Sequence, residues 1–203
     1  MLFRSHNNLG YILTREGDYK NAEAEFRTAL SYTPDFESAQ LNLKNVLQLE
    51  TLQSYNEHGV ELMQQGKYKD AEAVFRQVLQ YQPDNPVAQN NLAFLMLQSG
   101  QDVDMALSLA ESARRSMPHS TNTADTLAWA YYHKGIYGSA RALLEDAAKT
   151  NPNDASIQYH LGMVYSKMGN KADAVDHLKK AVSLAPGTQT GNDANKALSS
   201  LGT

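Results

Sequence analysis

Apolar and small side chains recur along the chain at the three- and four-residue spacings of amphipathic helices, and these helices come in pairs. A Gly-x-Tyr-x-x-Ala motif marks each pair, with its clearest copies at Gly17, Gly66 and Gly135 and weaker copies at Gly100 and Gly169. The successive glycines are 49, 34, 35 and 34 residues apart. A proline follows each copy, at Pro34, Pro83, Pro118, Pro152 and Pro186. The pattern predicts two-helix units that repeat about every 34 residues.

Two further columns of small residues stay in register with this period. The first helix of each pair carries Gly10, Gly59, Ala93, Ala128 and Gly162. The second helix carries Ala22, Ala71, Ala106, Ala140 and Ala174. Small residues let the two helices of a pair approach closely, glycine ends the first helix because it tolerates positive φ, and proline stops the second helix. One pair cannot bury its own apolar face, so we expect the pairs to stack into a common core.

These columns resemble the tetratricopeptide repeat over roughly residues 3–188, and the later repeats are loosely similar to bacterial envelope and secretion-associated members of that family. The resemblance implies an all-α fold, a right-handed α-α superhelical solenoid. We predict repeats at 3–36, 52–85, 86–120, 121–154 and 155–188. An extra unpaired helix is predicted at 37–51 and a C-terminal capping helix at 189–203.

The extra segment at 37–51 allows two interpretations. It is either a separate helix, with Ser54 and Glu57 capping the next one, or the start of one long helix that runs to about Gln65. The apolar stripe drifts near Glu50 and Thr51, which favours a break or bend at that point. A continuous helix would separate the first repeat from the others and could permit exchange between protomers.

The resemblance also implies a concave groove lined by the first helix of each repeat. Its first column, mostly amides that could pair with a peptide backbone, is Asn7, Asn56, Asn90, Asp125 and Tyr159. Its second, mostly apolar column is Tyr11, Val60, Phe94, Trp129 and Met163, and a third position adds Met63, Leu97 and Tyr132. We expect Trp129 and Tyr132 to be exposed anchors for a ligand. Val60, Phe94 and Met163 could equally pack between repeats, and an asparagine could be structural, bonding a neighbouring carbonyl.

Composition and charge narrow the function further. The net charge is −4, so no basic surplus points to nucleic acid, and no apolar run is long enough to insert into a membrane. Cysteine is absent, and the six histidines form no metal-binding motif. We therefore expect no enzyme activity, no metal and no cofactor. No leader is visible, so the expected location is the cytoplasm, or the bacterial periplasm or envelope if a leader was trimmed.

The function expected from these features is that of a scaffold that binds a partner peptide or protein segment in its concave groove. Two alternatives stay open. One is a self-associating structural protein, a homo-oligomer formed through residues 1–51. The other is a regulatory module cut from a larger protein.

Overall fold

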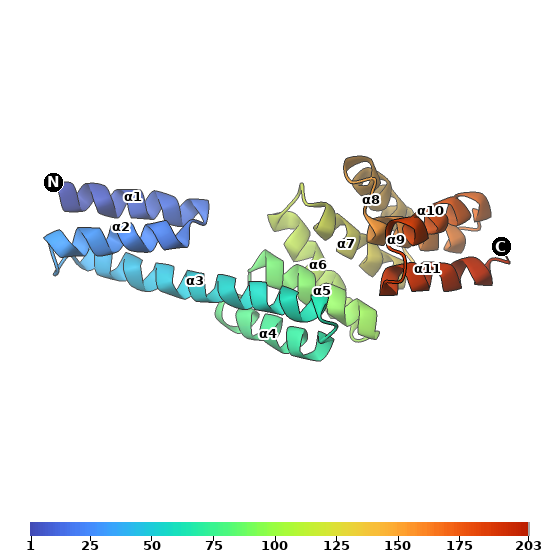
Figure 1. Cartoon of the computed structure of the whole chain (residues 1–203), viewed down its shortest axis with the longest axis horizontal. Helices are drawn as coiled ribbons and strands as arrows, with labels where there is room; N and C mark the ends of the chain where they lie inside the picture. Colours follow the sequence, from blue (N-terminus) through green and yellow to red (C-terminus); the bar gives the residue numbers. More distant parts are fainter. Residues whose placement is uncertain (203) are drawn as a thin grey trace. The chain divides into compact units, whose positions relative to one another are not determined.

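The computed structural model describes residues 1–202, and every regular element in this range is an α-helix (Figure 1). The helices are α1 (Leu2–Glu16), α2 (Tyr19–Tyr32), α3 (Glu37–Gln64), α4 (Tyr68–Tyr81), α5 (Pro86–Ser99), α6 (Val103–Ser116), α7 (Thr121–His133), α8 (Tyr137–Thr150), α9 (Ala155–Lys167), α10 (Lys171–Leu184) and α11 (Gln189–Ser200).

Local chemistry sets the helix ends. The side chains of Asp18, Asp102 and Asp154 each accept a hydrogen bond from a backbone N–H in the first turn of the helix that follows. The five glycines that lie between the two helices of each pair have positive φ angles between 67° and 81°. This confirms the predicted role of Gly17, Gly66, Gly100, Gly135 and Gly169.

The chain divides into two compact units, and the first runs from Met1 to Val74. In it, α1 pairs with α2, and α2 packs in turn against α3. The core of this unit contains Phe26 and Val46. A Cβ atom added to Gly10 would lie 2.7 Å from the ring of Phe26, so only glycine permits this approach of α1 to α2.

The second unit begins at Phe75 and contains the pairs α5–α6, α7–α8 and α9–α10. Leu144 of α8 and Leu161 of α9 are buried together between neighbouring pairs. At the C-terminal end, α11 packs on α10 and covers Leu178 and Ala181 with Ala194. The apolar face of α10, the second helix of the final pair, is therefore covered, as a capping helix requires.

The predicted break near Glu50 and Thr51 was wrong, because α3 is one continuous helix. Residues 35–58 contain neither glycine nor proline, and the Thr51 hydroxyl donates to the Leu47 carbonyl within the helix. The drift of the apolar stripe has another cause. Two first-helix patterns follow each other along α3, one in residues 37–51 and one from residue 52. They are offset by 15 residues, which is a rotation of about 60° beyond whole turns of the helix. Each half of α3 therefore buries a different face.

Among residues 1–202, no helix combines the length and the apolar character needed to cross a bilayer.

Candidate protein-binding surface

Most of the first groove column is buried, and two of its members join neighbouring first helices instead of facing solvent. Asn7, Asn90 and Asp125 are all buried. Asn42 Nδ2 donates to Asn7 Oδ1 at 3.0 Å, from α3 to α1. Asp125 Oδ1 lies 2.7 Å from His160 Nδ1, between α7 and α9. Asn7 thus has a structural contact, with the Asn42 side-chain amide and not with a carbonyl, and Asp125 makes a similar link between first helices.

One acceptor in this column has no hydrogen-bond partner. Asn90 Oδ1 is buried on α5 without a donor among the described residues. A buried acceptor left unpaired typically costs about 1–3 kcal/mol. Asn90 is therefore the member of the first column that retains an unused hydrogen-bonding group.

Trp129 is the centre of an aromatic cluster, not an exposed anchor. The side chain was expected to be exposed, but only 6% of Trp129 is accessible. Its indole stacks on Tyr132 with ring centroids 4.4 Å apart and on His160 with centroids 4.1 Å apart. The expectation was wrong because His160, on the next first helix, closes over the indole.

The rim of this cluster is partly exposed and comes from two helices. Tyr132 is half-buried, and its ring lies 5.7 Å from that of Tyr137. Tyr159 of α9 is also half-buried, 6.0 Å from the indole of Trp129. His133 is exposed and contacts Trp129 edge-on at 4.9 Å. Trp129 thus acts as a rigid support for rings that reach the surface.

The titratable groups of the rim are held in their neutral forms. Burial raises the pKa of Tyr132 to about 12, with smaller contributions from Tyr159 and Tyr137. Burial also raises the pKa of Tyr159, helped by Asp193. Burial lowers the pKa of His133, and the nearby His160 lowers it further. At neutral pH the rim therefore presents uncharged rings with hydrogen-bonding tips, which suits an apolar or aromatic ligand.

The remaining predicted residues of the second unit differ in their exposure. Phe94 of α5 is half-buried. Leu97, predicted to face the groove, is only 2% exposed and belongs to the core. Met163 is half-buried and packs against the buried cluster of Leu178, Ala181 and Ala194, so packing accounts for part of its surface. The prediction for Leu97 was wrong because Phe94 lies on the partly exposed side of α5, whereas Leu97, about one turn later, lies in the core.

The predicted residues of the first unit do not form an aromatic cluster of this kind. Tyr11 of α1 is 55% exposed. On α3, Asn56 is buried, whereas Val60 and Met63 are half-buried.

Two histidines make contacts that the sequence did not reveal. His160 stacks on Trp129, and its Nδ1 lies 2.7 Å from Asp125 Oδ1. His177 of α10 lies 2.7 Å from Gln158 Oε1 and stacks on Tyr165, with ring centroids 5.5 Å apart. The only signal in the sequence is the separation of 35 residues between Asp125 and His160, which matches that between Asn7 and Asn42.

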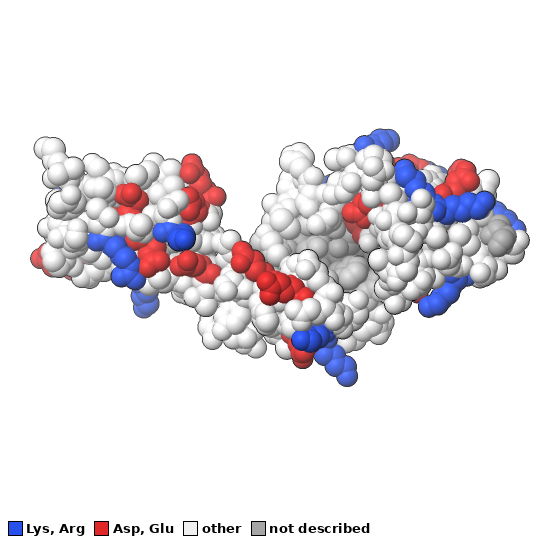
Figure 2. All heavy atoms as spheres, viewed as in Figure 1, with Lys and Arg blue, Asp and Glu red and all other residues white. Residues whose placement is uncertain are grey.

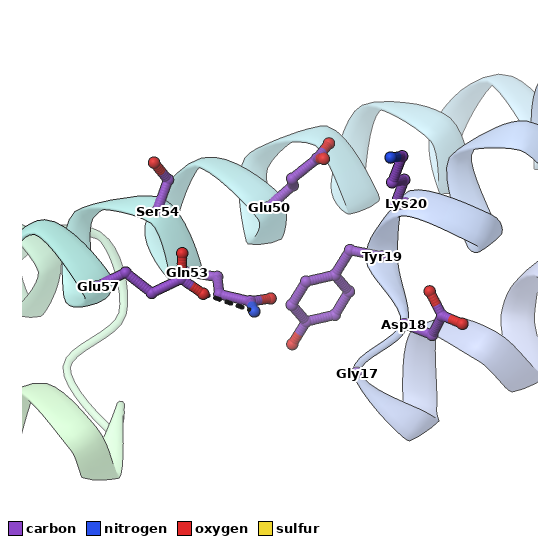
Figure 3. A pocket seen from close by; sticks show the side chains of 8 residues that line it. All are labelled: Gly17, Asp18, Tyr19, Lys20, Glu50, Gln53, Ser54 and Glu57. Atoms are coloured by element: carbon purple, nitrogen blue, oxygen red, sulfur yellow. Dashed lines mark hydrogen bonds between the residues drawn. The ribbon is translucent and has the colours of Figure 1, made fainter.

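A recess of about 290 Å³ lies in the first unit between the start of α2 and the middle of α3 (Figure 3). Tyr19 points toward it, and Gln53 Nε2 donates to Glu57 at 3.0 Å on its α3 side. Asp18 and Glu50 also line it, with Lys20 as the single basic residue. The recess lies where α3 continues beyond the start of α2, and three of its four charged lining residues are acidic.

Charge is mixed elsewhere on the surface. On the face shown in Figure 2, Lys and Arg side chains lie among Asp and Glu side chains and form no continuous basic area. Within residues 1–202, no group of three or more His, Asp or Glu side chains is arranged to hold a metal ion.

Comparison with known families identifies the repeats. Two tetratricopeptide-repeat models match residues 3–36 and 62–104. A model of anaphase-promoting complex, cyclosome, subunit 3 matches residues 99–181. The chain thus contains segments that match the tetratricopeptide repeat, and the predicted all-α solenoid class is confirmed.

Individual relatives are distant. Cellulose synthase operon protein C of Escherichia coli K12 is 28% identical over 103 residues, which are 51% of this chain and 9% of that protein. This chain therefore spans only a small part of that relative. A thermophilic TPR protein of Thermus thermophilus has a similar structure, with 20% identity, a TM-score of 0.53 and 98% coverage of both chains. YrrB, a TPR protein with an unusual peptide-binding site, has 19% identity, a TM-score of 0.51, and coverage of 94% and 90%.

Tetratricopeptide repeats in general form protein–protein interaction modules, and repeat scaffolds of this kind are generally not enzymes.

Proposed function

We propose that the chain binds a segment of a partner protein on the first-helix surface of its second unit. The observation that carries the proposal is the partly exposed rim of Tyr132 and Tyr159 around the buried Trp129. Rings that are already stacked lose little conformational entropy when a ligand packs on them, which favours binding by apolar anchors.

Two further features support this surface. Phe94 of α5 occupies the same groove column as Trp129 of α7, and α5 contacts α7 directly. Phe94 therefore extends the apolar area along the second unit. Asn90 Oδ1 lacks a donor, and a small rotation of the amide would let it accept from the main-chain N–H of a bound segment. YrrB is described as having a peptide-binding site, and a peptide is proposed here as the ligand class.

The test is a selection of peptides from a random display library on the immobilised protein. Selected peptides are then titrated while the fluorescence of Trp129, the single tryptophan in the chain, is recorded. We expect Tyr132→Ala and Phe94→Ala each to weaken binding by about tenfold, the loss typical of a minor hot spot. Trp129→Ala is a poor probe, because it would empty the core of the cluster.

Tyr81→Ala is the matched control. Tyr81 is 60% exposed at the end of the second helix α4, outside the first-helix columns. Peptides that bind both groove variants as tightly as the unchanged protein would refute the proposed surface. Selection of no peptide at all would refute the ligand class.

A further inference from the structure

The second unit contains a recess of about 290 Å³ where α8, α9 and α10 meet, called here the α8–α10 recess. Ala148 of α8 and Leu161 of α9 give it an apolar lining. The exposed Lys149 of α8 and Lys180 of α10 also line it. None of its lining residues belongs to the groove columns, so this recess is separate from the surface on which the proposed function rests.

The recess is associated with one unusually short side chain. Ala148 occupies a position that recurs in every second helix, eight residues after the alanine column, and that is half-buried in each copy. The other copies carry larger side chains at this position, which are Leu30, Leu79, Arg114 and Val182. Alanine at this position therefore leaves space that a longer side chain of the chain itself occupies elsewhere.

Arg114 shows how the preceding repeat uses this position. Its Nη1 donates to the Ser120 carbonyl at 2.9 Å and lies 3.5 Å from Thr123 Oγ1. The Arg114 side chain thus bridges α6 to the start of α7. Ala148 has no atom beyond Cβ, so it makes no such bridge from α8 to α9. One junction between repeats is filled from within, and the next is left open to a side chain from outside.

Side chains in the α8–α10 recess are held in place by hydrogen bonds and stacking. Gln158 is only 1% exposed, and its Nε2 donates to the Pro152 carbonyl at 2.9 Å. Its Oε1 lies 2.7 Å from His177 Nδ1, and the His177 ring stacks on Tyr165. The Tyr165 hydroxyl donates to Glu145 at 2.7 Å. Side chains that are already ordered lose little conformational entropy when a ligand packs on them.

The charges of the recess favour an acidic ligand. Glu145 is the single carboxylate in the lining, and it already contacts Tyr165 and lies 3.6 Å from Arg141 Nε. Within residues 1–202, neither Lys149 nor Lys180 takes part in an ion pair. Two ammonium groups beside an apolar lining are complementary to carboxylates that flank an apolar group.

We propose that the α8–α10 recess binds an acidic segment of a partner protein. One leucine-sized side chain of the segment packs against Ala148 and Leu161, and neighbouring carboxylates pair with Lys149 and Lys180. The volume is at the lower limit of small-molecule pockets, about 300–1,000 Å³, so it suits one side chain of a longer ligand. One buried side chain and two exposed ion pairs give a weak contact, with a dissociation constant on the order of 1 mM.

The experiment is an NMR titration of the ¹⁵N-labelled full chain with three short peptides at up to about 5 mM, a range that covers such an affinity. The probe is acetyl-Glu-Leu-Glu-amide. Acetyl-Lys-Leu-Lys-amide reverses its charge, and acetyl-Glu-Gly-Glu-amide removes its apolar side chain. We expect the probe to shift the amide signals of Ala148, Gln158 and His177, and the other two peptides to bind at least about tenfold more weakly.

Two variants test the position of the site. Ala148→Arg introduces the residue of the preceding repeat and should weaken binding of the probe at least about tenfold, because the space is then filled. Lys149→Glu combined with Lys180→Glu should reverse the preference, so that acetyl-Lys-Leu-Lys-amide binds more tightly than the probe. Lys171→Glu combined with Lys179→Glu is the matched control, since both lysines are exposed on α10 outside the lining. Circular dichroism checks that every variant keeps its helices.

The outcomes separate this site from the groove. Phe94→Ala should leave binding of the probe unchanged, because Phe94 does not line the recess. Absence of shifts around Ala148 overturns the proposal, as does equal binding of the three peptides. Ala148→Arg that binds as tightly as the unchanged protein overturns the location. A loss in the lysine control equal to that in the variant of Lys149 and Lys180 overturns the role of these two lysines.

Discussion

Helices α1 and α9 occupy the same place in their repeats but lie in different surroundings. Leu9 of α1 and Leu161 of α9 belong to one column, yet Leu9 is 45% exposed and Leu161 only 1%. The links to the adjacent first helix also differ in depth. Asn7 and Asn42 bond where Asn42 is partly exposed, whereas Asp125 and His160 bond in the interior. The repeat determines which residue types occur, but the neighbouring helices determine what each residue contributes.

The largest difference in stability is expected between the side-chain link of Asp125 to His160 and that of Asn7 to Asn42. His160→Ala removes the partner of a buried carboxylate and one face of the Trp129 stack, so it should lower the free energy of unfolding by about 3–5 kcal/mol. Asn42→Ala breaks a partly exposed amide bond and should cost about 1 kcal/mol. Urea unfolding followed by circular dichroism measures both. Equal losses would show that burial does not distinguish the two links.

The leucine column should show the next largest contrast. Leu161→Ala leaves a cavity between α8 and α9 and should cost about 2–5 kcal/mol. Leu9→Ala removes an exposed side chain and should change the stability of the monomer by less than about 0.5 kcal/mol. Both are measured by urea unfolding at a concentration too low for self-association. A large loss for Leu9→Ala would mean that its face is already covered in the monomer.

The small-residue column is a feature that α1 and α9 share, so substitutions in it should lower the stability of both helix pairs by similar amounts. Added Cβ atoms at Gly10 and Gly162 would each lie 2.7 Å from the facing side chain, Phe26 or Leu178. Gly10→Ala and Gly162→Ala should each cost about 1–3 kcal/mol, because either helix pair must separate. Thermal unfolding of the two variants checks this. Gly138→Ala is the control, since nothing lies within 4 Å of its added Cβ.

The smallest effect concerns the phenol of Tyr132. Its folded-state pKa of about 12 lies above the ordinary value of 10.0 because burial favours the neutral form. Between these values the folded state holds the proton more firmly than the unfolded state, so stability is intact below pH 10 and falls as the pH rises toward 12. Tyr132→Phe should make this fall shallower. Denaturant midpoints at several pH values measure it, and parallel curves for the two proteins would contradict it.

Much of the fold could be predicted from the sequence because local rules govern it. The glycines and prolines punctuate the helices, and the small column that contains Gly10 and Gly162 brings each pair together. The continuity of α3 could not be predicted, since the drifting stripe suggests a break and helix propensity around Thr51 is too weak a guide to decide the point. The apolar positions in the two halves of α3 are explained only when the helices that pack on each half are known.

The candidate site was predicted less well, for a related reason. Tyr132 and Phe94 do reach the surface, but Trp129 and Leu97 do not. Whether a first-helix side chain is exposed depends on what the next first helix places above it. His160 lies one residue after the groove column, and no periodic pattern shows that its ring closes over Trp129.

The helix α11 has a consequence for the second unit. By packing on α10 it keeps Leu178 and Ala181 out of water, so removing α11 would expose an apolar face that the repeat pattern of α10 cannot cover by itself.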